Sequence, residues 1–205
     1  METPVLQVLD TLPKPRIERL RSYVVLLDKW RRITNLISDR SFDEVWTRHI
    51  EDSITIWKAY PTARRWLDIG SGAGFPGVVL GVILADHQGA QVHCVESDGR
   101  KCGFLRTAAT ELYIPIKVHN VRAEGITIRD TGPIDALTAR AFSTINHVVA
   151  LGEHYLAQGA VAILPRGKTS THEVETLDAR RYAINVNSGH GGGTILSIRE
   201  RVKGP

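Results

Sequence analysis

The chain has 205 residues, of which 42% are hydrophobic and 23% charged, a globular composition that excludes a disordered or fibrous chain. No stretch reaches the roughly 18 apolar residues that a membrane helix requires, and the N-terminus lacks the apolar segment of a signal peptide. Two cysteines are too few for a disulfide scaffold, and no Cys/His cluster has the spacing of zinc ligands. We expect a soluble cytoplasmic protein, monomeric, with no membrane or metal partner.

The net charge of +4 lies mostly in the N-terminal part, because residues 1–65 carry 12 Lys and Arg against 9 Asp and Glu. Such an excess of positive charge permits an anionic partner such as RNA. Charge informs about association and not about fold, so this observation alone does not identify the partner.

The N-terminal part has the pattern of helices. Apolar residues at helical spacing predict a helix over residues 16–30. Ser41 and Glu44 form a capping-box pattern, which predicts that a second helix begins there and that helical structure runs to about Tyr60, before Pro61. We therefore assign residues 1–62 to a helical extension and residues 63–205 to the main domain, the two forming one compact unit.

From residue 65 on, short strands alternate with helices. The predicted strands cover residues 65–69, 91–96, 116–121, 134–139, 160–164, 182–186 and 194–199. The predicted helices cover residues 76–85, 99–112, 144–156 and 170–177. This alternation predicts an α/β fold with a mostly parallel sheet covered by helices on both faces. A glycine-rich turn joins the last two strands, so we expect them to form an antiparallel C-terminal hairpin.

The segment LDIGSGAGFPG, residues 67–77, places four glycines between a predicted strand and a predicted helix. Glycines there allow a ligand to approach the backbone at the carboxyl ends of the strands. Gly72, Gly74 and Gly77 also match the dinucleotide pattern, so two cofactors compete. Asp68 at the strand end disfavours a diphosphate and suits the positively charged S-adenosylmethionine. Glu96, at the end of the next strand, is suited to bind ribose hydroxyls in either cofactor.

Seven segments, in their order and spacing, resemble the RsmG (GidB) family of class I S-adenosylmethionine-dependent methyltransferases. The segments are NLI at 35–37, RHIEDS at 48–53, DIGSGAGFPG at 68–77, VES at 95–97, KCGFLR at 101–106, VRAE at 121–124 and ARAF at 139–142. The resemblance implies a Rossmann-like fold with a seven-stranded sheet. It also implies S-adenosylmethionine as cofactor, methylation of ring nitrogen 7 of a guanine, and bacterial 16S rRNA within a small-subunit ribosomal particle as partner.

The resemblance also implies roles for individual residues. The residues that it assigns to the cofactor, together with the loop residues above, are Asp68, Gly70, Gly72, Gly74, Phe75, Glu96, Ala123, Glu124 and Arg140. Arg140 is placed near the face where the methyl group is transferred. His49 and Asp52 are assigned with Arg140 to the catalytic centre, at its mouth.

Several arginines and a lysine are candidates for binding RNA phosphates, namely Arg31, Arg32, Arg48, Arg166 and Lys168. Arg166 departs from the family pattern, which commonly has lysine at that position, and a planar guanidinium changes the contact geometry. The turn at residues 189–193 lies outside the shared pattern, and we interpret it as a loop tip without function.

Three other functions stay open at this point. The chain is also compatible with a class I methyltransferase that acts on a protein or a small molecule. A nicotinamide-dependent oxidoreductase fits the glycine pattern alone. A non-catalytic RNA-binding module with a vestigial pocket fits the charge.

Overall fold

The computed structural model describes residues 11–167, 174 and 176–201. Its helical elements are α2 (Lys14–Arg31), α3 (Asp39–Asp43), the π-helix η1 (Val45–Ile50), α4 (Glu51–Ala59), α5 (Gly77–Leu84), α6 (Gly99–Glu111), the 3-10 helix η2 (Ala123–Gly125), α7 (Ile128–Thr131), α8 (Ile145–Leu156) and the 3-10 helix η3 (His190–Gly192). The strands are β1 (Arg65–Ile69), β2 (Gln91–Glu96), β3 (Ile116–Asn120), β4 (Ala136–Thr138), β5 (Val161–Arg166), β6 (Tyr182–Ser188) and β7 (Thr194–Glu200).

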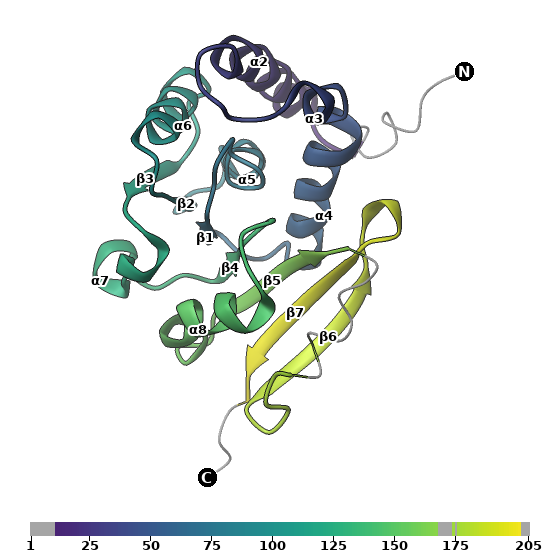
Figure 1. Cartoon of the computed structure of the whole chain (residues 1–205), viewed down its shortest axis with the longest axis vertical. Coiled ribbons are helices and arrows are strands. Elements are labelled where there is room, and N and C mark those ends of the chain that lie inside the picture. The colour runs from purple at the N-terminus through teal and green to yellow at the C-terminus, as the bar shows by residue number, and fades with distance from the viewer. Residues whose placement is uncertain (1–10, 168–173, 175, 202–205) are drawn as a thin grey trace.

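The strands form one sheet in the order β3-β2-β1-β4-β5-β7-β6 (Figure 1). The first five strands run parallel, and β7 pairs antiparallel with both β5 and β6. This confirms the predicted mostly parallel seven-stranded sheet with an antiparallel hairpin at its C-terminal end. The strand order reverses between β1 and β4, and ligands of such sheets bind at the carboxyl ends of the strands next to this point.

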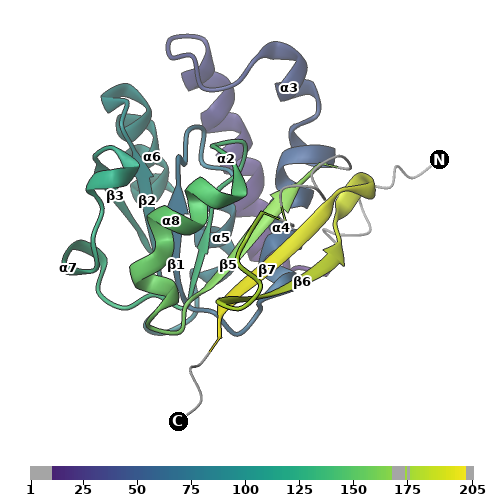
Figure 2. The ribbon, with the colours of Figure 1, turned by 60° about the horizontal axis from the view of Figure 1, so that its bottom comes forward.

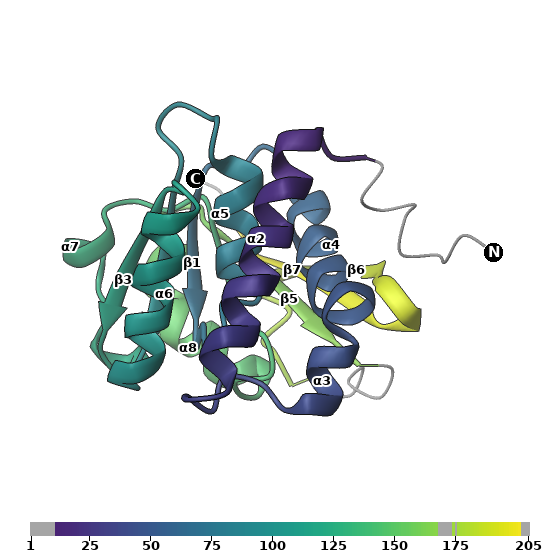
Figure 3. The same ribbon diagram turned by 90° about the horizontal axis from the view of Figure 1, so that it is seen from above.

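Helices cover both faces of the sheet. Figure 3 shows α6, α5, α2 and α4 along one face, and α8 lies on the other face (Figure 2). Helix α5 is buried along its whole length because its sequence GVVLGVIL is apolar all round. Alternate residues of β1 divide the interior into two cores, since Trp66 packs in the core on the α5 side and Leu67 in the core on the α8 side.

The N-terminal helices share the α5-side core. Leu20 and Leu27 of α2 and Ile54 of α4 are fully buried in the same cluster as Trp66 and Val78. Burial of this apolar surface ties the helical segment to the sheet. The boundary at residue 62 stays a prediction.

The predicted start of the second helix at Ser41 is wrong. Helix α3 begins at Asp39, and the Ser38 side chain caps it by accepting a hydrogen bond from the Ser41 amide. Ser41 is therefore inside the first turn of a helix whose cap stands three residues earlier. The predicted end before Pro61 is confirmed, because α4 ends at Ala59. The predicted helix over 170–177 lies largely outside the described residues.

Within the part of the chain that the structure describes, no helix combines the length and the apolar character needed to cross a bilayer. The same residues contain no group of three or more His, Cys, Asp or Glu side chains arranged to hold a metal ion.

Candidate functional site

Hydrogen bonds from the end of β2 hold the glycine loop between β1 and α5. The amides of Gly70 and Ser71 both donate to the carbonyl of Val95, at 2.9 and 3.0 Å. The Gly72 amide donates to a carboxylate oxygen of Glu96 at 3.0 Å. The backbone path of the loop is therefore set by the strand next to it.

A hollow of about 240 Å³, here called the loop hollow, opens beside the glycine loop. It is lined by Gly70, Gly72, Val95, Glu96, Ser97, Lys101, Val121, Ala123, Ala141 and Phe142. Gly72 has a φ of +54°, and a Cβ on it would meet only the Gly70 carbonyl oxygen, at 3.8 Å. This glycine thus presents bare backbone to the hollow.

The chemistry of the loop hollow fits a nucleoside that carries no phosphate. The Glu96 carboxylate stands at the loop amide that a diphosphate would need, and its charge repels such a group. The same oxygens can accept hydrogen bonds from ribose hydroxyls. Val121, Ala123 and Phe142 supply an apolar wall that suits an adenine ring.

Asp68 lies beneath the loop. Its side chain is fully buried, and its Oδ2 accepts a hydrogen bond from the Gly77 amide at 3.0 Å. Burial raises the pKa of Asp68 to about 7, although hydrogen bonds from Ser71 and Gly77 oppose the shift. The sequence assigned Asp68 to the cofactor. In the structure, its buried carboxyl group instead contacts the glycine loop from the protein interior.

Sequence reasoning missed Tyr23, which supports the loop from α2. Its side chain is fully buried, and its hydroxyl donates to the Ala73 carbonyl at 2.5 Å. Its ring also packs on Phe75, with centroids 5.3 Å apart. A tyrosine on the apolar face of a predicted helix gives no sign that its hydroxyl bonds a loop 50 residues away.

A second hollow of about 750 Å³, the arginine cleft, opens between α4, the ends of β4 and β5, and the β6–β7 turn. It is lined by Glu44, Thr47, Arg48, Asp52, Thr55, Arg140, Ala141, Ser143, Pro165, Arg166, Gly167, Gly189, His190, Gly191, Gly193, Thr194 and Ile195. Ala141, whose φ is +51°, lines both the arginine cleft and the loop hollow. The two hollows therefore meet at this residue.

Arg140, His49 and Asp52, predicted to be catalytic, come together where the hollows meet. A guanidinium nitrogen of Arg140 donates to Nδ1 of His49 and lies 3.8 Å from Asp52 Oδ2. Because guanidinium can only donate, His49 carries its proton on Nε2. Burial and the adjacent Arg140 lower the pKa of His49 to about 4, so the imidazole is neutral at pH 7. The His49 ring stacks on Phe75, with centroids 5.0 Å apart.

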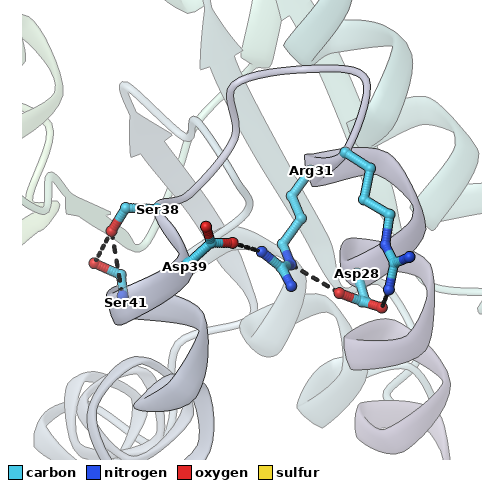
Figure 4. Close-up of polar contacts among 6 residues, drawn as sticks. Asp28, Arg31, Ser38, Asp39 and Ser41 are labelled. Carbon is cyan, nitrogen blue, oxygen red and sulfur yellow. Dashed lines mark hydrogen bonds and ion pairs between the residues drawn. The ribbon is translucent and has the colours of Figure 1, made fainter.

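The structure engages Arg31, a predicted RNA ligand, in contacts within the protein. Its guanidinium donates to Asp28 at 2.8 Å and bonds Asp39, as Figure 4 shows. The same group lies 4.1 Å from the centroid of the Phe42 ring. With its side chain only 17% exposed, Arg31 links α2 to α3 and has little surface left for a phosphate.

The other predicted RNA ligands differ in position. Arg32 is well exposed and pairs with Asp28, outside both hollows. Arg48 and Arg166 line the arginine cleft. Arg48 is exposed and pairs with Glu44, and Arg166 donates to the Ser143 carbonyl at 3.2 Å. Lys168 lies outside the described residues.

Of the remaining residues that were predicted to bind the cofactor, some line the loop hollow and others do not. Gly70 and Ala123 line the loop hollow, whereas the exposed Glu124 does not. Gly74 is needed for packing, because a Cβ there would lie 2.4 Å from Val78. Phe75 is buried between the rings of Tyr23 and His49 and is absent from the lining of both hollows.

Comparison with known proteins matches residues 16–189 to the family rRNA small subunit methyltransferase G, GidB. The chain belongs to the GidB family. The relative from Bradyrhizobium diazoefficiens, named Ribosomal RNA small subunit methyltransferase G, is 42% identical over 80% of this chain and 62% of its own length. The protein of the same name from Brucella anthropi is 37% identical over 82% of this chain and 78% of its own length. The chain thus spans less than two thirds of the first relative.

Solved structures of low identity share the fold. A mutant of MtNAS in complex with S-adenosylmethionine aligns with a TM-score of 0.55 at 14% identity, over 90% of this chain and 76% of its own. Precorrin-6y C5,15-methyltransferase from Geobacter metallireducens aligns with a TM-score of 0.54 at 14% identity, over 81% of this chain and 91% of its own. The GidB chain therefore has the class I methyltransferase fold.

The bare backbone of Gly72 predicts the effect of a side chain there. In a Gly72→Val variant of the GidB chain, the side chain occupies the loop hollow, and calorimetry should detect no binding of S-adenosylmethionine. Gly132→Val is the matched control, because Gly132 has a φ of +69° with nothing within 4 Å of an added Cβ. Gly132 also has a ψ of −170°, in a region almost restricted to glycine, so valine there is strained by about 1–3 kcal/mol and controls for the effect of backbone strain. Wild-type affinity in Gly72→Val, or equal loss in both variants, contradicts this role.

The hydrogen bond from the Tyr23 hydroxyl to the loop predicts that its loss weakens the binding of S-adenosylmethionine. Tyr23→Phe leaves the Ala73 carbonyl without its partner, and we expect the Kd for S-adenosylmethionine to rise about tenfold, the equivalent of one hydrogen bond. Tyr155→Phe is the matched control, because that buried hydroxyl bonds Thr131 on the other face of the sheet, at 3.0 Å. An unchanged Kd in Tyr23→Phe, measured by calorimetry, means that the hydroxyl does not position the loop.

The raised pKa of Asp68 predicts a pH dependence of stability. Between pH 3.8 and about 7 the folded protein keeps a proton that the unfolded chain has lost. The free energy of unfolding contributed by this group therefore falls as pH rises, by at most about 1.4 kcal/mol per unit. Urea unfolding should show that the free energy of unfolding of the wild type falls relative to that of Asp68→Asn as pH rises across this range, whereas Glu111→Gln, which removes an exposed carboxylate, should follow the wild type. Parallel profiles for the wild type and Asp68→Asn contradict the assignment.

Proposed function

We propose that the chain is an S-adenosylmethionine-dependent methyltransferase that acts on ring nitrogen 7 of a guanine in bacterial 16S rRNA. The observation that carries this proposal is the meeting of the two hollows at Ala141. One hollow offers an acid and bare glycine backbone to a nucleoside, and the other offers arginines to a nucleic acid. Membership of the GidB family supports the same conclusion.

Residues of the loop hollow hold the donor. Glu96 accepts hydrogen bonds from the ribose hydroxyls, and Gly72 leaves room for the ligand against the loop. S-adenosylmethionine, when bound, supplies an electrophilic methyl group on its sulfonium sulfur. Tyr23 and Asp68 keep the loop in place from α2 and from below.

The state of His49 favours an acceptor that needs no base. Nδ1 of His49 is occupied by Arg140, and the pKa of His49 is about 4, so this imidazole is a poor proton acceptor at pH 7. Ring nitrogen 7 of guanine has an in-plane lone pair and no proton to lose. Holding this nitrogen about 3 Å from the methyl group, with water excluded, is then sufficient.

Charges around the arginine cleft divide into two roles. A base methylated at ring nitrogen 7 carries positive charge, and Asp52 places a carboxylate in the cleft that stabilises it. Arg48 and Arg166 face the phosphates on either side of the base. A single small unit with this cleft suits folded 16S rRNA in a small-subunit particle, bound by a monomer in the cytoplasm.

A labelled-methyl assay tests the proposal. The chain is mixed with methyl-labelled S-adenosylmethionine and small ribosomal subunits that lack this modification. We expect the label in 7-methylguanosine after digestion of the 16S rRNA, because the base needs no deprotonation at the site. Label in protein, in another nucleoside or in no product contradicts it.

Arg140→Ala is the variant control for this assay. It removes the group that contacts both His49 and Asp52, so we expect transfer to fall by about tenfold or more. Unfolding curves measured alongside separate this loss from a loss of fold. Wild-type turnover in this variant removes Arg140 from the site.

A further inference from the structure

The turn between β6 and β7, residues 189–193, reaches the arginine cleft. It contains η3, which contacts α4, and the hairpin that carries it extends beside α4 in Figure 1. Gly189, His190, Gly191 and Gly193 all line the cleft. The interpretation of this turn as a loop tip without function does not account for that position.

His190 attaches the turn to α4 through a buried acid. Its Nε2 lies 2.7 Å from Oε2 of Glu51, whose side chain is only 3% exposed. Burial raises the pKa of Glu51, and within the described chain its Oε1 has no hydrogen-bond partner. Burying a carboxylate costs free energy, and the contact with His190 is the main interaction that offsets this cost for Glu51. Asp52, the next residue, faces Arg140.

The other end of the turn is fixed to the strand that carries Arg166. Thr194 pairs with Arg166 in the ladder between β7 and β5. A Cβ on Gly193 would lie 3.0 Å from the Arg166 carbonyl, so a larger residue there would have to displace that carbonyl by a few tenths of an ångström. The Gly189 amide donates to the Gly193 carbonyl at 2.8 Å and closes the turn. The turn is thus anchored to both sides of the cleft.

We propose that His190, bonded to Glu51, is a positioning residue that holds the 189–193 turn as the outer wall of the cleft that binds the substrate nucleotide. This inference rests on the proposed function. The pair sets the affinity for RNA by fixing the width of the arginine cleft. It leaves the affinity for S-adenosylmethionine unchanged, because His190 and Glu51 are absent from the lining of the loop hollow.

The test compares His190→Ala, His190→Gln, and His190→Ala combined with Glu51→Gln. For each, steady-state kinetics give KM and kcat for small ribosomal subunits, anisotropy gives the Kd for a labelled 16S rRNA fragment, and calorimetry gives the Kd for S-adenosylmethionine. We expect His190→Ala to raise the RNA KM and Kd about tenfold, the effect of losing one charge-assisted hydrogen bond. We expect kcat and the cofactor Kd to stay within about twofold, and His190→Gln, which keeps a donor for Glu51, to recover most of the RNA affinity.

The double variant separates positioning from stability. His190→Ala leaves a buried carboxylate unpaired and lowers Tm, and Glu51→Gln in addition removes that charge and should restore Tm. If His190 positions the turn, the KM and Kd for RNA stay above their wild-type values in the double variant. Recovery of RNA affinity together with Tm, or no change in His190→Ala, overturns the inference.

The two proposals fail in different ways. If the wild type binds the rRNA fragment but transfers no methyl group, the proposed function fails and the Kd series still decides the role of His190. If the wild type neither binds the fragment nor methylates the subunits, both proposals are overturned. If it methylates the subunits without binding the fragment, the KM series decides the role of His190. If the wild type methylates the subunits and His190→Ala has wild-type KM and Kd, only the role of His190 is overturned.

Discussion

The fully buried carboxylate of Asp68 is the constraint on which the glycine loop depends. Its Oδ2 bonds the Gly77 amide, and a Cβ on Gly77 would lie 2.6 Å from that oxygen and 2.7 Å from Cys94. The start of α5 can therefore lie this close to β1 only with glycine at residue 77. Glu96 holds the same loop from the other side. Two carboxylates, one beneath and one beside the loop, fix the backbone at the switch point of the sheet.

The N-terminal helices belong to the site as much as to the core. Helix α2 supplies Tyr23 to the loop, η1 supplies His49 and α4 supplies Asp52. The rings of Tyr23 and His49 both pack on Phe75, whereas Asp52 lines the arginine cleft. We therefore expect changes in the packing of the N-terminal helices to alter ligand binding as well as stability.

The sheet could be predicted from the sequence because apolar alternation and glycine-rich turns are local signals. Glu96 could be predicted for the same reason, since it ends a recognisable strand, whereas Arg140 was predicted from the family resemblance. Tyr23 and His190 were missed because their roles depend on partners 50 and 139 residues away, Ala73 and Glu51. The burial of Asp68 could not be predicted either, because a short sequence segment does not show which face of a strand end the following loop covers.

Ala141 combines a left-handed backbone with the smallest side chain that has a Cβ. An alanine in this conformation costs about 1 kcal/mol relative to glycine. Glycine would relieve that strain but would let the backbone sample other conformations, whereas a larger side chain would take up space where the two hollows meet. Alanine at residue 141 thus keeps the side chain at the junction of the two hollows small while restricting the backbone more than glycine would.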